Sequence, residues 1–533
     1  MTASPAFRRA AGAVVVVLTA LVFGQVAGFR FVYWDDYYNF VLNTAFRKEW
    51  TTAADWGYIF DVQHVVRFQP VAWLVYKAVD VLWGMNAGAF HVANLVVHMA
   101  NAGLFFAVLL RLRPERAGAR AVALAGVVAL AWAVNPLRAE PVAWATDLPY
   151  MLATLFFLGS LLAYLRYEQA GARGAARWWL AGAVGLFLLA MSSYPLPLTW
   201  PLALPLVAVA LRMPTGPVNL GAVVRESRKS WVATALMLAP AAVVVAVTVY
   251  DRTAYKGMVF KPVGVDASAW IGRLEHIVVV PPYFVYKFLA PFGLSPVHFA
   301  ECDAVGWALA AFAGIFWIGF LFLLLRWRTN LRALLWFCVY LVVCIPVMNL
   351  TEPVLIPPDR YAHLANLVML MGVYDCVAGA AWVERKFTVV MLGLGAWVAC
   401  SLALCWAQVG VWKDSYTLFT YLEAQPCVQE HADLRYEVQS YLAAQLTVDG
   451  RNWEAVAQYK DYAQHHGVDA AVLHQLGLNY FELGQYAHAL LVLKEAETLM
   501  PNPLTEGLIQ QAEKKQAEET GASPGTATPA AKP

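Results

Sequence analysis

Charged residues are scarce in this sequence. Asp, Glu, Lys and Arg make up 14% of the 533 residues, and 38 basic against 36 acidic residues leave a net charge of +2. This balance argues against the strongly basic surface of a nucleic-acid-binding protein, so no nucleic-acid partner is expected. Hydrophobic residues make up 60% of the chain and include 21 Trp. The composition predicts a polytopic membrane protein.

Cysteine is scarce as well, with seven residues in the chain. No CxxC pair or comparable metal spacing occurs, so neither a cysteine zinc site nor a disulfide framework is predicted. Most of the thiols fall inside apolar runs, where cysteine behaves as a small hydrophobic residue: Cys338, Cys344, Cys376, Cys400 and Cys405.

Long apolar runs are abundant and predict an all-α bundle of about eleven membrane spans. The runs cover residues 11–28, 90–110, 121–135, 148–165, 178–191, 195–211, 231–250, 305–325, 334–350, 364–383 and 389–411. Arg8 and Arg9 before the first run also resemble the start of a cleavable signal peptide. We interpret the run as a retained helix with a cytoplasmic N-terminus, because many spans follow and basic residues favour the inner side.

One apolar segment, residues 271–294, is ambiguous because Arg273, Glu275, Pro281-Pro282 and Lys287 interrupt it. If it does not cross the membrane, five basic segments fall on the cytoplasmic side. These segments are residues 111–120, 166–177, 212–229, 326–332 and 385–386. We therefore expect 271–294 to be interfacial or re-entrant.

This topology places four loops together on the extracytoplasmic face, numbered here as the outer segments in chain order: residues 31–89, 136–147, 251–303 and 351–363. The first contains Asp35 and Asp36 directly after the first helix, followed by an amphipathic stretch over 71–82 that should lie in the headgroup layer. Two adjacent carboxylates at this position are either a solvated helix cap or a catalytic pair. The aromatic residues around them are mainly expected to form an interfacial belt.

Three further polar groups lie on or near the same face. His91, Asn94, His98 and Asn101 follow one side of a span, which favours hydrogen bonds between helices, with His91 the member nearest to a substrate. Arg138 and Glu140 open the second outer segment, and Arg360 and Tyr361 precede a late span. An Arg at such a boundary is either a snorkelling anchor or a ligand for a lipid phosphate.

After Trp412 the hydropathy falls and the pattern becomes one of paired soluble helices. Gly477, Tyr480, Gly484, Ala489 and Pro501 keep the spacing of a tetratricopeptide repeat of about 34 residues. One repeat length earlier in the chain, residues 435–468 are predicted to form a second, degenerate repeat. The tail over 516–533 is low in complexity, and we expect it to be disordered.

These motifs carry a family resemblance. The segments YWDDYYNFVLN, QPVAWLVYKAVDVLWGMNAGAFHVANLVVHMANA, NPLRAEPVAW and PPDRYAHLA, ending in repeats, resemble the transmembrane and tetratricopeptide repeat-containing O-mannosyltransferases and their bacterial relatives. The resemblance implies a GT-C membrane domain over 1–411, a tetratricopeptide-repeat domain over 412–515, and the tail. It also implies a bacterial inner-membrane enzyme with its active site and repeats in the periplasm.

The resemblance implies transfer of a sugar, with mannose as one candidate, from a polyprenyl-phosphate donor to an acceptor hydroxyl. Asp35 matches the family's acid/base carboxylate, and Asp36 is its orienting partner. Arg67, Arg138 and Arg360 are candidates to stabilise the departing phosphate, since that group needs positive charge more than a proton. His91, Asn94, Glu140 and Tyr361 match recurring family positions. This scheme requires neither a metal nor a cofactor beyond the donor substrate.

The sequence also departs from the eukaryotic family pattern. Gln69, Leu148 and Tyr150 replace a family Arg, Arg and Asp, and Tyr194-Pro195 replaces a Lys-Glu pair. The acceptor therefore stays open between protein Ser or Thr and a lipid or cell-surface glycan. Helical repeats favour a protein acceptor or partner, because their concave surfaces bind peptides. Two other classes are a non-catalytic membrane scaffold that presents the repeats and a transporter, although no clear mid-membrane charges or inverted repeats favour the transporter.

Overall fold

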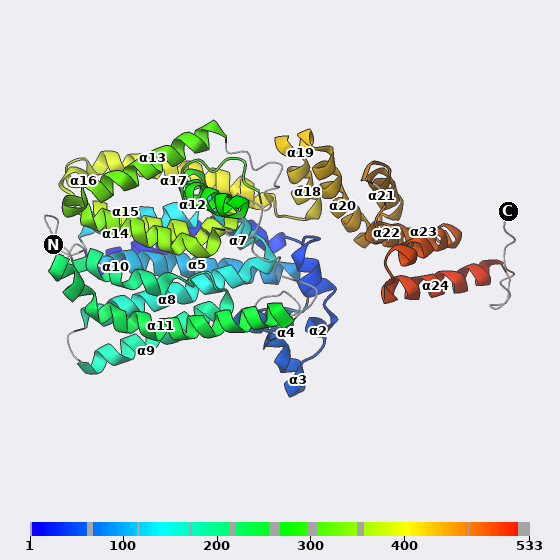
Figure 1. Cartoon of the computed structure of the whole chain (residues 1–533), viewed down its shortest axis with the longest axis horizontal. Coiled ribbons are helices and arrows are strands. Elements are labelled where there is room, and N and C mark those ends of the chain that lie inside the picture. Colours follow the sequence, from blue (N-terminus) through cyan, green and yellow to red (C-terminus); the bar gives the residue numbers. More distant parts are fainter. Residues whose placement is uncertain are drawn as a thin grey trace. The chain divides into compact units, whose positions relative to one another are not determined.

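The computed structural model describes residues 3–60, 68–113, 118–170, 173–212, 220–254, 267–295, 306–348, 357–466 and 468–520. These residues form helices and connecting turns without a β-strand (Figure 1). The chain divides into two compact units, Met1–Lys413 and Asp414–Pro533. The predicted boundary between residues 411 and 412 differs from this division by two residues. We call the first the membrane unit and the second the repeat unit.

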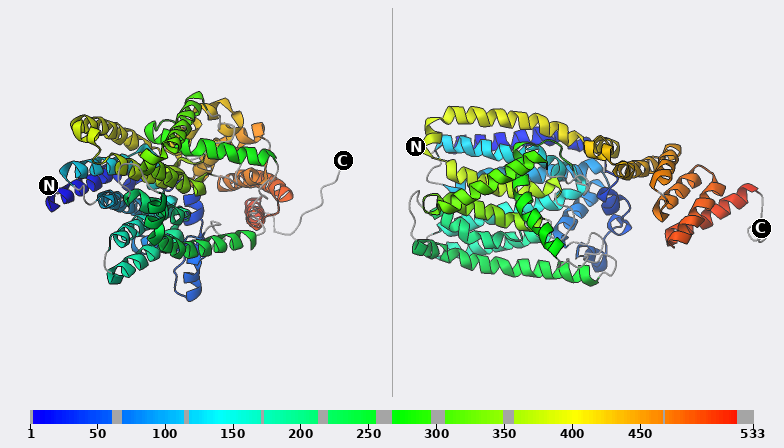
Figure 2. Two further views of the ribbon diagram at one scale, coloured as in Figure 1. Left: turned by 60° about the vertical axis from the view of Figure 1, so that its left-hand side comes forward. Right: turned by 45° about the horizontal axis from the view of Figure 1, so that its top comes forward.

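The long helices of the membrane unit run side by side (Figures 1 and 2). Eight helices in the described part of the chain are long and apolar enough to cross a bilayer. They are α1 (Pro5–Phe23) with η1 (Gly24–Gly28), α5 (Ala87–Leu112), α8 (Leu148–Gln169), α9 (Arg173–Ser193), α11 (Leu220–Ala254), α13 (Trp307–Leu325), α14 (Trp327–Cys344) with η8 (Ile345–Val347), and α17 (Phe387–Gly410). Large apolar side chains on α13 and α17 are exposed, as lipid-facing residues would be.

A ninth span is formed if α6 (Ala119–Ala133) is counted with the short helices η5 (Pro136–Arg138) and α7 (Ala139–Ala143), from which it is bent by 57°. Two of the predicted spans are shorter than expected. The first, α10 (Trp200–Arg212), has 13 residues because its predicted first turn, around Pro195 and Pro197, lies outside the helix. The second, α15 (Ala362–Val377), has 16 residues and is buried on most sides, so its polar residues contact other helices.

The second outer segment was predicted as a loop but is instead a buried chain of short helices. Asn135 follows α6 and caps η5, because its side chain accepts a hydrogen bond from the Leu137 backbone N–H. Pro136 and Pro141 then interrupt the backbone ladder, giving η5, α7 and η6 (Ala145–Asp147) before α8 begins. The segment therefore presents fixed side chains rather than a mobile connection.

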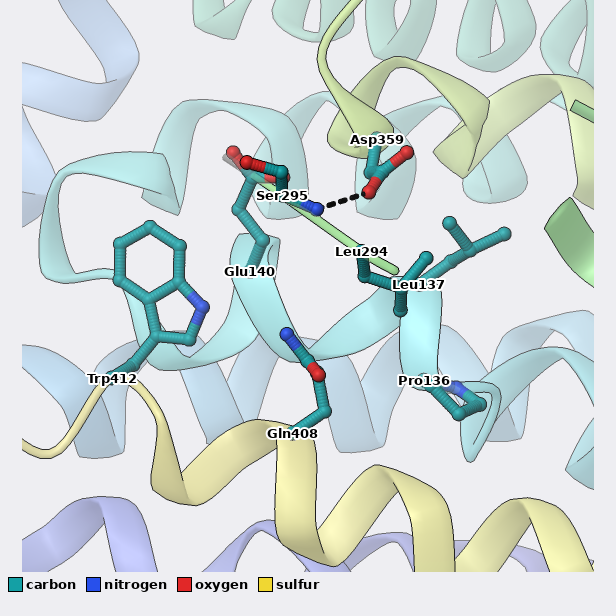
Figure 3. A pocket seen from close by; sticks show the side chains of 8 residues that line it. All are labelled: Pro136, Leu137, Glu140, Leu294, Ser295, Asp359, Gln408 and Trp412. Carbon is teal, nitrogen blue, oxygen red and sulfur yellow. Dashed lines mark hydrogen bonds between the residues drawn. The ribbon is translucent and has the colours of Figure 1, made fainter. Parts of the chain in front are cut away.

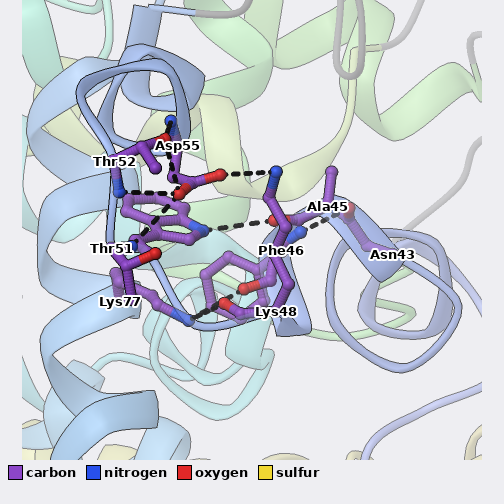
Figure 4. A network of polar contacts seen from close by, with 9 residues as sticks. Asn43, Ala45, Phe46, Lys48, Thr51, Thr52, Asp55 and Lys77 are labelled. Carbon is purple, nitrogen blue, oxygen red and sulfur yellow. Dashed lines mark hydrogen bonds and ion pairs between the residues drawn. The ribbon is translucent and has the colours of Figure 1, made fainter.

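In the first outer segment, the described residues 31–60 and 68–89 contain five short helical pieces before α5: η2 (Tyr37–Val41), α2 (Thr44–Arg47), α3 (Ala53–Trp56), η3 (Gly57–Phe60) and α4 (Pro70–Trp83). The stretch predicted to be amphipathic forms α4, which buries Trp73, Tyr76 and Lys77 and exposes Leu82 and Trp83, and its placement in the headgroup layer stays a prediction. A polar network holds these pieces together (Figure 4). Within it, the buried Lys77 ammonium donates to the carbonyls of Phe46 and Lys48 at 2.9 and 3.0 Å. A second ammonium, that of Lys48, pairs with Asp55 at 2.6 Å.

The segment predicted to be interfacial or re-entrant forms one helix, α12 (Ala267–Leu289). This helix is not among the eight helices that qualify as spans by length and hydropathy. In its first half, Nδ1 of His276 donates to the Met348 carbonyl at 2.8 Å, and in its second half the hydroxyl of Tyr283 donates to Asp359 at 2.6 Å. Both contacts tie α12 to the region where α14 ends and α15 begins. The interfacial placement of α12 stays a prediction.

The repeat unit is a stack of antiparallel helix pairs. Its helices are α18 (Ser415–Glu423), α19 (Pro426–Glu430), α20 (Ala432–Val448), α21 (Asn452–His466), α22 (Ala470–Glu482), α23 (Tyr486–Leu499) and α24 (Pro503–Thr520). Turns after α20 and α22 contain Gly450 and Gly484 with φ of 71° and 72°, a left-handed conformation that glycine adopts easily. A Cβ on Gly477 would lie 2.4 Å from Leu493, so the absence of a side chain lets α22 and α23 pack closely.

Most of the predicted tail lies outside the described residues, and α24 continues through 516–520.

Candidate functional site

The first two outer segments meet at Asp36. This carboxylate is fully buried, and one of its oxygens accepts from the backbone N–H and the hydroxyl of Thr146 at 3.0 and 2.5 Å. Its other oxygen accepts from the Val32 N–H at 3.1 Å. Burial raises the pKa of Asp36 to about 7, although the three donors oppose the shift by favouring the ionised form. The neighbouring Asp35 is exposed, so the two adjacent carboxylates occupy different environments.

Trp144 connects the acidic pair with the late outer segment. Its ring lies 5.6 Å from that of Trp34, the residue before Asp35, and 5.2 Å from the guanidinium of Arg360. The ring of Trp412 also stacks on Trp144 at 5.2 Å. One indole therefore separates the region of the carboxylate pair from the cation at residue 360.

Arg360 is fixed in place by Glu140. Its side chain forms an ion pair with one oxygen of Glu140, and its backbone N–H donates to the other oxygen at 3.1 Å. Only a small part of either side chain is exposed. Arg360 and Glu140 were both predicted from the sequence, but their pairing was not.

Asp359 joins the third outer segment to this group. Its carboxylate accepts from the hydroxyl of Tyr283 at 2.6 Å and from the backbone N–H of Ser295 at 2.8 Å. All four predicted outer segments are thus linked by direct contacts: the first to the second through Asp36, the second to the fourth through Glu140, and the fourth to the third through Asp359.

A small open hollow of about 10 Å³, room for about one water molecule, lies beside Glu140 (Figure 3). Its lining contains two carboxylates, one hydroxyl, one amide and one indole together with aliphatic groups: Pro136, Leu137, Glu140, Leu294, Ser295, Asp359, Gln408 and Trp412. Carboxylates only accept hydrogen bonds, so this lining suits a ligand that donates several. Asp35 does not line the hollow and lies on the other side of Trp144, toward Trp34.

The remaining predicted site residues lie behind the site or outside the described residues. His91 and Asn94 are fully buried and bond to the carbonyls of Arg30 at 3.2 Å and Trp144 at 2.6 Å, which favours the interpretation as hydrogen bonds between helices. The rings of Tyr361 and Tyr150 are stacked at 6.2 Å. Arg67 lies outside the residues that the structure describes.

Arg138 is fully buried and does not line the hollow. Its guanidinium lies 5.7 Å from the ring of Trp132, and none of its three nitrogens has a hydrogen-bond partner among the described residues. Glu140 and Asp359 are within electrostatic range of this cation. Arg138 therefore adds positive potential behind the two carboxylates rather than a direct ligand contact.

Sequence reasoning missed Trp144, Thr146 and Asp147. Asp147 is buried within electrostatic range of Glu140 and Arg360. A signal was present, because Thr146 and Asp147 stand at the start of a long apolar run, just as Asp35 and Asp36 follow the end of one.

No cluster of three or more His, Cys, Asp or Glu able to hold a metal occurs among the residues that the structure describes. Comparison with known proteins found no matching family model, no matching curated protein and no matching solved structure. The resemblance to the O-mannosyltransferases thus rests on the motifs in the sequence.

Proposed function

We propose that this protein is a membrane glycosyltransferase of the GT-C type that moves a sugar from a polyprenyl-phosphate donor to an acceptor hydroxyl. The observation that carries the proposal is the meeting of the Asp35-Asp36 segment with the Glu140–Arg360 pair across Trp144. A carboxylate that can take a proton and a guanidinium that can hold a phosphate are the two groups that this reaction needs most.

Asp35 is the proposed general base because it is exposed and has a rigidly held neighbour. In our scheme it removes the proton from the acceptor hydroxyl as that oxygen bonds to the anomeric carbon. The bond from this carbon to the phosphate oxygen breaks, and the polyprenyl phosphate leaves with the electron pair. Asp36 anchors the segment through Thr146 and Val32 and so orients Asp35.

Arg360 is the proposed contact for the departing phosphate. Its pairing with Glu140 fixes the guanidinium before substrate arrives, so little free energy is spent on ordering the side chain during the reaction. The potential of Arg138 from behind supports the same role.

The lining of the hollow beside Glu140 is the proposed contact for the sugar hydroxyls, with the sugar ring itself in the open space outside the hollow. Glu140, Asp359 and Gln408 offer acceptors to sugar hydroxyls, and Trp412 offers an aromatic face to the C–H groups of a pyranose ring. Every hexose presents both hydroxyls and a C–H face, so these contacts do not select one sugar. Mannose is one candidate among them.

We further propose that the repeat unit is a tetratricopeptide-repeat domain that binds a protein acceptor or partner. Two observations support this proposal. Gly450 and Gly484 adopt the same left-handed backbone conformation, and α22 and α23 pack closely at Gly477. The corresponding location is a bacterial inner membrane, with the site and the repeats on the periplasmic side.

The test incubates the purified full chain with labelled polyprenyl-phosphate sugars and periplasmic acceptors. Asp35→Asn should lower the transfer rate by about 100-fold or more, because a positioned base contributes that much. Glu49→Gln is the matched control, since Glu49 is an exposed carboxylate of the same outer segment and its loss should leave the rate unchanged. Equal rates for the wild type and Asp35→Asn would remove Asp35 from catalysis, and no transfer by the wild type would favour the scaffold.

A further inference from the structure

Aromatic residues surround the exposed carboxylate of the first outer segment. Asp35 and Tyr38 are both exposed, and the backbone between them is helical, because the Tyr38 N–H donates to the Trp34 carbonyl at 3.4 Å. Side chains three residues apart in such a turn are neighbours. Tyr33 and Trp34, just before Asp35, are partly exposed. We call Tyr33, Trp34 and Tyr38 the aromatic surface.

Buried rings hold two members of the aromatic surface in place. The ring of Tyr33 packs on that of Tyr37 at 4.9 Å, and the ring of Trp34 packs on that of Trp144 at 5.6 Å. Both supporting residues are buried. A hydrogen bond between the side chains of Tyr33 and Tyr38 joins the third ring to the set. Rings fixed before a ligand arrives lose little conformational entropy when it binds.

The polar groups of the aromatic surface complement hydroxyl groups. Burial, followed by the neighbouring Tyr38 and Tyr37, raises the pKa of Tyr33 to about 12. The Tyr33 hydroxyl therefore stays protonated near neutral pH and can donate as well as accept a hydrogen bond. An ionised Asp35 only accepts. A ligand that both donates and accepts through hydroxyls, and that has an apolar face for the rings, matches this combination.

The position of the aromatic surface associates it with the acceptor substrate. In the proposed reaction the base must touch the hydroxyl that it deprotonates, so the residues beside Asp35 contact the acceptor. The proposed donor contacts, Arg360 and the lining beside Glu140, lie on the other side of Trp144. One indole therefore separates the donor contacts from the acceptor contacts.

We propose that the acceptor is a carbohydrate whose pyranose ring stacks on the aromatic surface. The inference rests on the proposed sugar transfer and names its second substrate. A pyranose offers C–H groups to the ring faces, and its hydroxyls donate to Asp35 and accept from Tyr33. A Ser or Thr side chain has one hydroxyl and a small aliphatic part, so it leaves most of the aromatic surface unused. The repeat unit then binds a partner protein rather than the acceptor.

The chemical step keeps the balance of the proposed reaction. One hydroxyl of the acceptor sugar loses its proton to Asp35 and bonds to the anomeric carbon of the donor sugar. The bond from that carbon to the phosphate oxygen breaks, and polyprenyl phosphate leaves with the electron pair. The product is a glycosidic bond between two sugars.

The test gives the purified full chain a labelled polyprenyl-phosphate hexose and one of two kinds of acceptor. The first is the set of methyl glycosides of glucose, galactose and mannose, and the second is a peptide rich in Ser and Thr. We expect transfer to at least one methyl glycoside, at a rate at least about tenfold above that to the peptide.

Tyr38→Ala should raise the KM for that glycoside by about 2- to 12-fold, which is the value of one aromatic stacking contact. The KM for the donor should not change. Tyr38→Phe keeps the ring and should retain most of the affinity, which separates stacking from loss of the hydroxyl. Trp83→Ala is the matched control, since Trp83 is an exposed aromatic residue of the same outer segment, at the end of α4. It should leave both KM values unchanged, as a residue of an interfacial belt would.

The outcomes separate this inference from the proposed function. Transfer to the peptide but to none of the glycosides would overturn the carbohydrate acceptor and leave the proposed sugar transfer standing. No transfer to either kind of acceptor would overturn both. A Tyr38→Ala protein with the wild-type KM for the glycoside would show that the aromatic surface does not hold the acceptor.

Discussion

At the scale of single residues, Asp36 shows how the fold makes two adjacent carboxylates different. Its two oxygens accept three hydrogen bonds and carry the contact between distant segments, while Asp35 beside it stays exposed. Burial and hydrogen bonding act in opposite directions on the Asp36 carboxyl, and burial is the larger effect, which leaves its pKa at about 7. A carboxyl that titrates near neutrality makes the site sensitive to pH.

Thr146→Val should shift the pH dependence of transfer. The change removes the hydroxyl donor at 2.5 Å, so the ionised form of Asp36 loses a favourable contact and its pKa rises further. If the ionised form holds the site together, the acidic limb of the rate profile, near pH 7 in the wild type, moves to higher pH. Rates measured between about pH 5 and 9 check this.

The control for that measurement is Thr51→Val, since Thr51 is exposed in the first outer segment and its hydroxyl does not contact Asp36. A profile for Thr146→Val that coincides with the wild type would mean that Asp36 does not control the acidic limb.

At the scale of helices, the N-terminal turn of α5 is positioned by its approach to the end of the first helix. Gly88 lies so close to η1 that a Cβ would stand 2.3 Å from the carbonyl oxygen of Ala27. His91, one turn later, bonds to the Arg30 carbonyl just beyond. This approach sets where the chain leaves the first helix toward Asp35.

Gly88→Ala should lower the stability of the membrane unit by about 1–3 kcal/mol, because the added methyl group meets backbone that cannot move aside. Gly182→Ala on α9 is the comparison, since no atom lies within 4 Å of its added Cβ. There alanine should be neutral or stabilising by about 0.5–1 kcal/mol. Thermal unfolding of both variants in detergent measures the difference, and a Gly88→Ala protein as stable as the wild type would contradict the close packing.

The sequence predicted the apolar helices well because a bilayer demands long apolar runs. It predicted less well where the chain bends. Asn135-Pro136 was interpreted as the start of a loop, but the segment stays helical in short pieces because buried backbone groups need partners. The pairing of Glu140 with Arg360 and of Thr146 with Asp36 joins residues 220 and 110 positions apart. No local sequence pattern encodes contacts between residues so far apart in the chain. The predicted topology did, however, place the segments that make these contacts on one face.

At the scale of the whole molecule, the membrane unit has polar connections at both ends. Far from the candidate site, Asp375 on α15 is fully buried and accepts from Arg113 on α5 and from the indole of Trp336 on α14 at 2.9 Å. Arg113 in turn donates to the last carbonyls of α10. Four helices are therefore joined through one carboxylate.

Asp375→Asn should destabilise the membrane unit by about 3–5 kcal/mol, because it removes the buried carboxylate that pairs with Arg113 at 2.6 Å. Glu384→Gln provides the contrast, since its pair with Arg120 is exposed and should be worth about 0–1 kcal/mol. Unfolding temperatures of the two variants in the same detergent distinguish these cases. Similar small losses in both would mean that the buried pair contributes no more than a surface pair.

The repeat unit should fold without the membrane unit. Its hydrophobic core is formed by residues of the repeat unit itself, among them Leu446, Tyr459, Leu476, Tyr480 and Leu493. A fragment of residues 414–520 should be helical by circular dichroism and should unfold in one cooperative transition. Gly477→Ala should lower the midpoint of that transition, because the added methyl group meets Leu493. A gradual loss of helix without a transition would show that the core does not suffice.

The pairing of Glu140 with Arg360 also has a consequence for biosynthesis. During synthesis the ribosome delivers Glu140 long before Arg360, with 220 residues and several spans between them. Until α15 has been inserted, Glu140 lacks its cation, and the hollow lacks the wall that Asp359 provides. A chain released early would therefore hold the acidic pair without the guanidinium, and only the completed chain would have both halves of the site.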